Sequence, residues 1–543
     1  MHNIFQKQLS DKKSTILEYG LIIITACIPL LFNYPYRINL FLAWEGAFRI
    51  AQGEIPYRDF GSPVGYVFWI LPALFFKIFG PYVYTLIIVQ AFINILSGLA
   101  FKKLLKIFSV TSPVRLLPLL VFCLSYSMFN FWPWYNHFVF VVEMLGLCVL
   151  CAEVLTPVDK RSYLRITMAS LLIALTFLTK QDTGGLAAGI AFVILAFDFV
   201  YERKIKTALI FVGGYLISLF ILIVPFLSYE FSYWFNMGQL PHNARVDKFD
   251  IINELFGAST LIKLYVVFIV FILITQLNQM KDWKTEKSYF LFLLIVLAIL
   301  GQAAIIQVTS YTPIDGNIYF HGFAFAFIAF HFSKQVDFSK VVNLSLLFFL
   351  ICLWWSGVFW TRFLRERVQK VLVDNTAAKK NVISKRTYLM GGDSTVASGA
   401  SVRSKWIVSS IPSFKRIKIP EGTEIGIKQI LELPQSKKPH VKMLNMSELT
   451  PLAYDMGYEL ETGPQYPLWY HKGVAFFDRE VDNFCGKVNE KQYDIILFED
   501  IPNVNQFYPY EVRDCIVKNY TFKFKFLAPR IPEISYIEVY TKE

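Results

Sequence analysis

The feature that most constrains this chain is a series of long apolar runs, because a membrane-spanning helix needs about 20 consecutive apolar residues. The first run covers residues 15–32, and the last ends near Trp360. The runs between them begin near Tyr82, Pro113, His137, Tyr163, Gly184, Thr207, Ser259, Ser288, Ile318 and Val341. This pattern predicts a polytopic α-helical membrane protein with about eleven transmembrane helices.

Composition excludes several other classes of protein. Hydrophobic residues make up 55% of the chain and charged residues 17%, whereas a typical soluble domain has roughly 25% charged residues. Such a chain is neither intrinsically disordered nor a small disulfide-stapled scaffold. The chain has a net charge of +12. In a membrane protein such an excess of basic residues usually lies in the cytoplasmic loops that fix the topology, so nucleic acid is not an expected partner.

The positions of lysine and arginine predict the orientation in the membrane. Residues 63–80 can be counted as a span or as an interfacial helix. The second choice places the basic clusters in the cytoplasm, as the positive-inside rule requires; they are Lys102/Lys103/Lys106, Lys160/Arg161, Arg203/Lys204/Lys206, Lys281/Lys284/Lys287 and Lys334/Lys340. We therefore expect a multi-pass protein of the plasma (inner) membrane with a cytoplasmic N-terminus, a retained first anchor and an extracytoplasmic C-terminal tail.

The C-terminal tail differs in character from the apolar part. Glycine, proline and charged residues return, and short β-like runs alternate with helical stretches, which is typical of a small α/β domain. The β-like runs begin at Arg386, His440, Tyr493 and Ile534, and the helical stretches cover residues 447–454 and 508–518. We expect a transmembrane domain over residues 1–361, whose first outer loop at 37–80 carries interfacial helices, and an extracytoplasmic α/β domain over residues 362–543.

Two cysteines, Cys485 and Cys515, lie outside the apolar runs. On the predicted topology both face an oxidising compartment in a bacterium, where disulfides form. We therefore expect a bridge between them.

Ionisable residues near membrane depth are costly and are therefore functional candidates. On the predicted topology such residues gather at the outer face, and they are Glu45, Arg49, Arg58 and Asp59 in the first outer loop, Lys180 and Asp182 after the fifth span, and Arg245 after the seventh. A carboxylate can take a proton from an acceptor hydroxyl, and Arg or Lys can hold a phosphate leaving group. The pattern predicts a site for a phosphate-bearing lipid and a polar acceptor.

The first outer loop also carries a recognisable set of short motifs. They are Trp44-Glu45, Ala51-Gln-Gly-Glu-Ile-Pro-Tyr-Arg-Asp-Phe, Pro63-Val-Gly-Tyr and Lys77-Ile-Phe-Gly. With these motifs the loop resembles that of GT-C-type glycosyltransferases, the superfamily of dolichyl-phosphate-mannose-protein mannosyltransferases and bacterial lipid A aminoarabinose transferases. The resemblance implies a GT-C-like fold with interfacial helices in this loop and an extracytoplasmic C-terminal domain.

The resemblance also implies an activity. It implies inverting transfer of a hexosyl or pentosyl group from a polyprenyl-phosphate donor to a glycan, lipid or protein acceptor at the extracytoplasmic face. In that superfamily an acidic residue just after the first span, often Asp followed by Glu, acts as the base. The matching position is Glu45, followed by Gly46, and Asp59 is the second candidate base. The donor supplies the energy, so no nucleotide motif is needed; a divalent metal is allowed, but no ligand cluster demands one.

Other interpretations of the same residues remain open. Glu45 can form an ordinary surface pair with Arg49 one helical turn later, Asp59 can belong to a turn, and Glu54 is expected to be a solvated loop residue. Alternative functions are an O-antigen polymerase or ligase, a polysaccharide or lipid transporter, and a binding scaffold. A transporter should have paired half-repeats and mid-span charges, whereas most charges here lie at span ends.

Overall fold

The computed structural model describes residues 8–36, 40–235, 248–253, 256–257, 259–277, 286–310, 319–359, 405–464, 466–470, 474–501, 507–530 and 535–542. The chain divides into two compact units, and each is made of segments that are not consecutive in sequence. One unit, here called the helical unit, comprises Met1–Pro29, Gln90–Val224 and Ala244–Gly357. The other, called the loop–tail unit, comprises Leu30–Val89, Pro225–Asn243 and Val358–Glu543.

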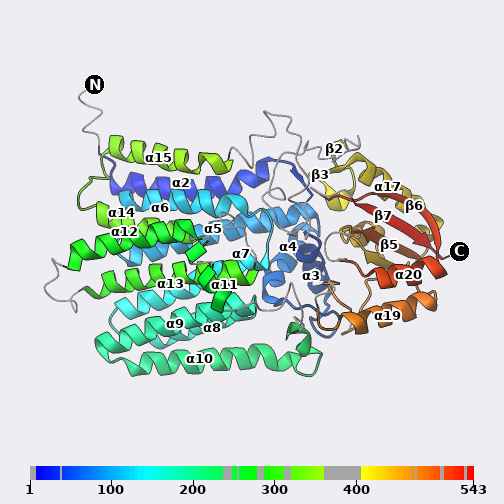
Figure 1. The fold of residues 1–543 in the computed structure, drawn as a ribbon, viewed down its shortest axis with the longest axis horizontal. Helices are drawn as coiled ribbons and strands as arrows, with labels where there is room; N and C mark the ends of the chain where they lie inside the picture. The colour runs from blue at the N-terminus through cyan, green and yellow to red at the C-terminus, as the bar shows by residue number, and fades with distance from the viewer. Residues whose placement is uncertain are drawn as a thin grey trace. The chain divides into compact units, whose positions relative to one another are not determined.

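The expected transmembrane helices are present, and each begins within a few residues of its predicted start. They are α2 (Asp11–Cys27), α5 (Val83–Ile107), α6 (Ser112–Ser125), α7 (Tyr135–Leu155), α8 (Ser162–Phe177), α9 (Gln181–Glu202), α10 (Ile205–Ile223), α12 (Thr260–Leu277), α13 (Lys287–Ser310), α14 (Phe320–Phe332) and α15 (Val341–Phe359). Within the helical unit the helices lie side by side (Figure 1). Among the described residues, 6 helical segments have the length and composition of membrane spans, and the others are shorter apolar helices.

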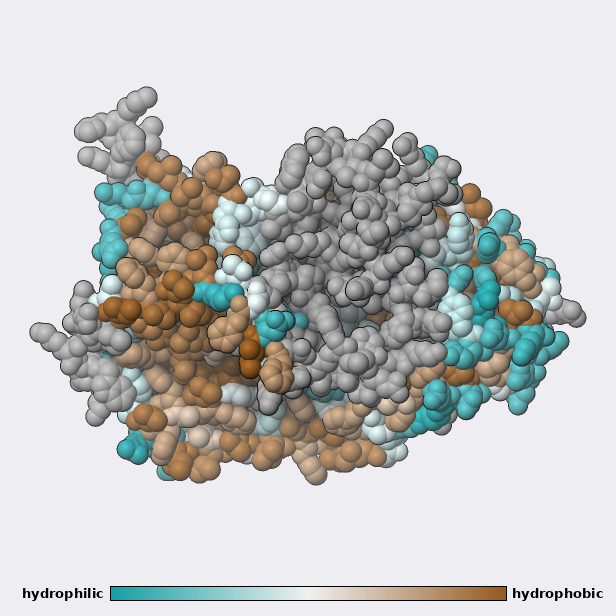
Figure 2. Space-filling model, viewed as in Figure 1, coloured by the Kyte–Doolittle hydropathy of each residue, from teal (hydrophilic) through white to brown (hydrophobic). Residues whose placement is uncertain are grey.

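The outer surface of the helical unit is apolar, as a lipid-facing surface must be. On α10 the side chains of Leu209, Leu216, Ile217 and Phe220 are all exposed. Figure 2 shows the hydrophobic surface over this part of the chain. In water such an exposed apolar surface would promote aggregation, whereas in a bilayer it contacts the lipid chains. These observations establish a multi-pass α-helical membrane protein.

Several charged residues inside the helical unit form ion pairs between helices. The fully buried Glu18 of α2 accepts bonds from Lys102 of α5 at 3.2 Å and from Arg115 of α6 at 3.0 Å. Lys287 of α13 binds Asp198 of α9 at 2.7 Å. Removing one partner of such a pair would leave a buried charge, so these contacts hold neighbouring helices in register.

The loop–tail unit joins the first outer loop to the C-terminal tail. The loop forms β1 (Tyr34–Pro35), α3 (Leu40–Gln52) and α4 (Val67–Phe79). Strand β1 pairs in parallel with the tail strand β3 (Ile417–Pro420), which also pairs with β2 (Trp406–Val408). By its contacts the first outer loop therefore groups with the tail, and the domain division at residues 361 and 362 stays a prediction. Helix α4 belongs to the loop–tail unit as well, and the interfacial interpretation of residues 63–80 stays a prediction.

The tail folds as the expected α/β domain. A four-stranded sheet has the order β4-β5-β7-β6, with β4 (Met443–Met446) parallel to β5 (Ile495–Asp500), and with β7 (Tyr536–Thr541) antiparallel to both β5 and β6 (Thr521–Leu527). Three of the predicted β-like runs are strands β4, β5 and β7, and the run at Arg386 lies outside the described residues. The helices are α17 (Glu421–Glu432), α18 (Leu452–Met456), α19 (Phe477–Asn489) and α20 (Tyr510–Asn519).

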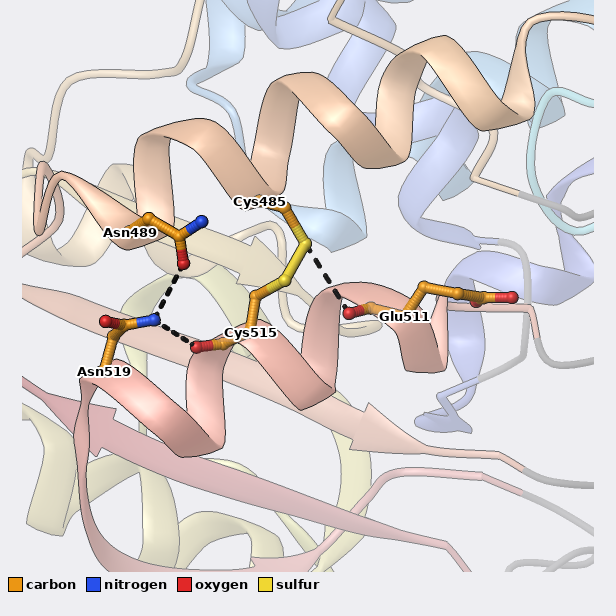
Figure 3. Close-up of a disulfide and its surroundings, with 5 residues drawn as sticks. All are labelled: Cys485, Asn489, Glu511, Cys515 and Asn519. Carbon is orange, nitrogen blue, oxygen red and sulfur yellow. Dashed lines mark hydrogen bonds between the residues drawn. A yellow bond between two sulfur atoms is a disulfide. The ribbon is translucent and has the colours of Figure 1, made fainter.

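The expected disulfide is confirmed. Cys485 of α19 and Cys515 of α20 are bonded, with their Cα atoms 5.6 Å apart. Figure 3 shows the bridge between the two helices, with Asn519 donating to Asn489 beside it at 2.8 Å. The two helices are thus joined by a covalent bond and by a side-chain hydrogen bond.

Candidate active site in the first outer loop

Helix α3 carries the leading candidate, Glu45, and close packing against α4 fixes its position. The indole Nε1 of Trp69 in α4 donates to the carbonyl of Leu42 in α3 at 2.9 Å. A Cβ added at Gly46 would lie 2.2 Å from that indole ring. Position 46 therefore has no room for a side chain while the Trp69 ring stays in place.

Glu45 forms an ion pair with Arg49, one helical turn later. Oε1 of Glu45 accepts from Nε of Arg49 at 3.0 Å and from Nη2 at 2.9 Å. The side chains are 4% and 0% exposed. The expected surface pair is therefore formed, but it is a buried pair, for which loss of one partner costs far more than at a surface.

Arg49 organises a wider network. Its Nη1 donates to Oε2 of Glu54 at 2.7 Å and to the carbonyl of Glu461 at 3.0 Å, and its guanidinium lies 4.4 Å from the centre of the Tyr466 ring. Burial opposes the charged form, but Glu45, Tyr466 and Glu54 together raise the pKa of Arg49 above its ordinary value. Arg49 is therefore a fixed cation at the centre of the cluster.

Glu54 is not the solvated loop residue that we expect from its neighbours in sequence. Its side chain is only 16% exposed because it pairs with the buried Arg49. Burial raises the pKa of Glu54, and the contact with Arg49 partly opposes this shift. The expectation is wrong because sequence position does not reveal that the loop folds back onto α3.

The second candidate base, Asp59, is engaged in a turn. Its Oδ2 accepts from the backbone N of Ile55 at 2.8 Å and from Nη2 of Arg58 at 2.6 Å, and its Oδ1 accepts from Nε of Arg58 at 2.9 Å. The hydrogen bonds from Arg58 lower the pKa of Asp59. Tyr57 in the same turn has a φ of 66°, which is uncommon for a residue with a large side chain. These contacts fit the turn interpretation, and a lowered pKa makes Asp59 a weaker base.

A segment of the tail binds the same loop. The backbone N of Gly61 donates to the carbonyl of Tyr466 at 2.7 Å, and the N of Leu468 donates back to Gly61 at 2.9 Å. The N of Gly463 donates to the carbonyl of Asp59 at 2.8 Å. We call residues 461–470 the tail segment; within it, Gln465 lies outside the described residues.

One tyrosine of the tail segment, Tyr466, contacts the Glu45 carboxylate, and a second, Tyr470, binds Tyr466. The Tyr466 hydroxyl lies 3.4 Å from Oε1 of Glu45, and the Tyr470 hydroxyl donates to that of Tyr466 at 2.9 Å. Burial, together with Glu45, raises the pKa of Tyr466, so it stays a proton donor. Sequence reasoning missed both tyrosines and Glu461, because no local motif marks them and they lie about four hundred residues further along the chain.

The remaining candidates come from other parts of the chain. Lys180 and Asp182 lie in the helical unit, at the start of α9, where Nζ of Lys180 is 3.0 Å from Oδ2 of Asp182. Asp182 also accepts from the backbone N of Thr183 at 2.6 Å, an arrangement that stabilises a helix N-terminus. Arg245 lies outside the described residues. Among the residues that the structure describes, no group of three or more His, Cys, Asp or Glu is placed to hold a metal ion.

Comparison with solved structures gives a match that covers nearly the whole chain. No family model matches the sequence, and no curated protein matches it. A solved structure, ArnT from Cupriavidus metallidurans in the apo state, matches at 10% identity over 97% of both chains, with a TM-score of 0.55. The Archaeoglobus fulgidus oligosaccharyltransferase matches at 12% identity over 73% of this chain and 59% of its own, with a TM-score of 0.38, too low to carry an argument. The whole-chain likeness to ArnT shows that this protein has the GT-C fold that the first outer loop predicts.

Proposed function

We propose that this protein is an integral-membrane glycosyltransferase that transfers a sugar from a polyprenyl-phosphate donor to a glycan, lipid or protein acceptor. The observation that carries the proposal is the GT-C fold over nearly the whole chain, together with a buried Glu–Arg cluster in the loop where that superfamily has its base. The sugar, the acceptor and inversion at the anomeric carbon are further parts of the proposal.

Glu45 is the preferred base on geometric grounds. All of its hydrogen bonds from the described residues end on Oε1, so Oε2 remains available to an acceptor hydroxyl. Asp59 has donors on both oxygens, and its pKa is lowered. A base with an unoccupied oxygen can take a proton when an acceptor binds, whereas a turn carboxylate would first have to break its own bonds.

The cationic candidates take different roles in the proposal. Arg49 is fully buried and each of its three nitrogens donates to Glu45, Glu54 or Glu461, so it orients Glu45 instead of binding phosphate. Arg58 has a side chain that is 45% exposed and can meet a lipid phosphate at the surface. Lys180, Asp182 and Arg245 stay candidates for binding the donor. No step in this mechanism requires a metal.

The cluster is proposed to face the extracytoplasmic compartment. The one-sided distribution of lysine and arginine supports this orientation. The Cys485–Cys515 disulfide in the tail also supports it, because disulfides persist in oxidising compartments and are rare in the cytosol. With the N-terminus in the cytoplasm, the odd number of expected spans puts the tail on the extracytoplasmic side.

The experiment that tests the proposal compares lipid-linked sugars in cells that lack the protein with those in the parent strain. We expect one polyprenyl-phosphate sugar to accumulate and one glycan, lipid or protein to lose the matching sugar. Expression of the wild-type chain should restore the parent profile, and a Glu45→Gln chain made in equal amount should not. An unchanged profile in the deletion strain would overturn the proposed function.

A further inference from the structure

We propose that Tyr466, in the C-terminal tail, is a positioning residue of the active site and acts through Glu45 and Arg49. The inference rests on the proposed function and assigns a task to the tail, which the sequence leaves without one. On this view the catalytic loop is incomplete without the tail segment, residues 461–470.

The hydroxyl of Tyr466 holds one oxygen of the Glu45 carboxylate. It donates to Oε1 at 3.4 Å and in turn accepts from the Tyr470 hydroxyl at 2.9 Å. Catalytic hydrogen bonds are often long before the substrate binds and shorten in the complex. Because Arg49 binds the same oxygen, the carboxylate is held with Oε2 as its unoccupied atom. The hydroxyl thus helps to decide which oxygen faces an acceptor.

The ring of Tyr466 acts on the other half of the ion pair. It lies 4.4 Å from the Arg49 guanidinium, while the Phe60 ring lies 5.6 Å away. A cation held against aromatic rings away from water has few alternative positions. The ring therefore restrains Arg49, and Arg49 restrains Glu45.

The backbone fixes the ring independently of its hydroxyl group. Gly61 exchanges hydrogen bonds with Tyr466 and Leu468, at 2.7 and 2.9 Å, and Gly463 donates to Asp59 at 2.8 Å. These bonds do not involve the side chain of Tyr466. A Tyr466→Phe variant should therefore keep the fold and the ring contact and lose only the two bonds of the hydroxyl, to Glu45 and from Tyr470, which separates a positioning role from a structural one.

The test uses the full-length protein in lipid nanodiscs with a polyprenyl-phosphate sugar as the donor, and it compares Tyr466→Phe with the wild type. We expect kcat to fall about tenfold, the usual effect of losing a hydrogen bond to a charged group, with the donor KM unchanged. The acid limb of the pH–rate profile should move to higher pH, because the lost bond favours the charged carboxylate. A purely structural role would not move this limb. The matched control is Tyr540→Phe. The Tyr540 hydroxyl donates to Glu538 at 2.8 Å in the same domain, and the variant should behave as the wild type.

The outcomes separate this inference from the proposed function. Wild-type kcat and pH profile in Tyr466→Phe, with Glu45→Gln inactive, would overturn the inference and leave the function standing. Full transfer by both variants would overturn the catalytic assignment on which the inference rests. Should Tyr466→Phe fail to fold, Tyr470→Phe decides: a smaller loss of kcat with the same shift of the acid limb supports the inference, and wild-type behaviour overturns it.

Discussion

Replacing Arg49 by methionine should destabilise the loop–tail unit more than any single change at its surface. The substitution keeps an unbranched side chain in the space but removes the charge and all of its donors. Glu45 loses two hydrogen bonds, at 2.9 and 3.0 Å, and Glu54 loses one at 2.7 Å. Two largely buried carboxylates then share a site without a counter-ion.

The size of the effect follows from burial. Breaking a buried ion pair costs about 3–5 kcal/mol, whereas an exposed pair contributes about 0–1 kcal/mol. For a domain of roughly 150–250 residues each kcal/mol lowers Tm by about 2–4 °C, so Tm should fall by about 6–20 °C. The matched control is Arg58→Met, which breaks the pair of a side chain that is 45% exposed and should change Tm by only a few degrees.

The assay is thermal unfolding of purified protein in one detergent, completed as a double-mutant cycle. Adding Glu45→Gln to Arg49→Met removes one of the uncompensated charges, so the double variant should melt above the Arg49→Met single variant. A Tm for Arg49→Met within about 2 °C of the wild type would refute the reasoning, because it would mean that the pair contributes no more than a surface pair.

Three further predictions concern the tail and the topology. Burial raises the pKa of Glu480 to about 9, so the unfolding free energy should fall as pH rises from 4.5 towards that value; Glu480→Gln should flatten the decline in Tm, and a wild-type decline would contradict this. Replacing Cys485 and Cys515 by serine opens a link across 30 residues and should lower stability by about 3–4 kcal/mol, measured by denaturant unfolding; unchanged stability would count against it. Reporter fusions at Lys103 and Glu543 should report the cytoplasm and the outside, and the same compartment for both would disprove the topology.

The helices could be predicted from the sequence because the length of an apolar run is a local property. The start of α7 near His137 and that of α13 near Ser288 follow from hydropathy alone. The pairing of Glu45 with Arg49 also follows from spacing, since residues four apart share a helix face. What spacing cannot give is burial, which depends on elements elsewhere in the chain.

The rest of the cluster could not be predicted for that reason. Tyr466 reaches Glu45 from 421 residues away, and no motif around it marks the contact. The sequence around Glu54 is typical of a solvated loop. It does not reveal that Glu54 folds back to pair with the buried Arg49. Helices α17 and α19 were not expected either, because both are amphipathic segments in a polar tail where no long apolar run marks a boundary.

The central claim is that this chain transfers a sugar from a polyprenyl-phosphate donor with Glu45 as the base, and one measurement tests it most directly. Purified wild-type protein and the Glu45→Gln and Asp59→Asn variants are given the donor that accumulates in the deletion strain, and the rate of sugar transfer is measured at equal protein concentration. The account predicts that Glu45→Gln lowers the rate by at least about a hundredfold while donor binding remains, as loss of a general base does. Full transfer by Glu45→Gln with loss in Asp59→Asn would move the base to Asp59, and full transfer by both variants would contradict the mechanism.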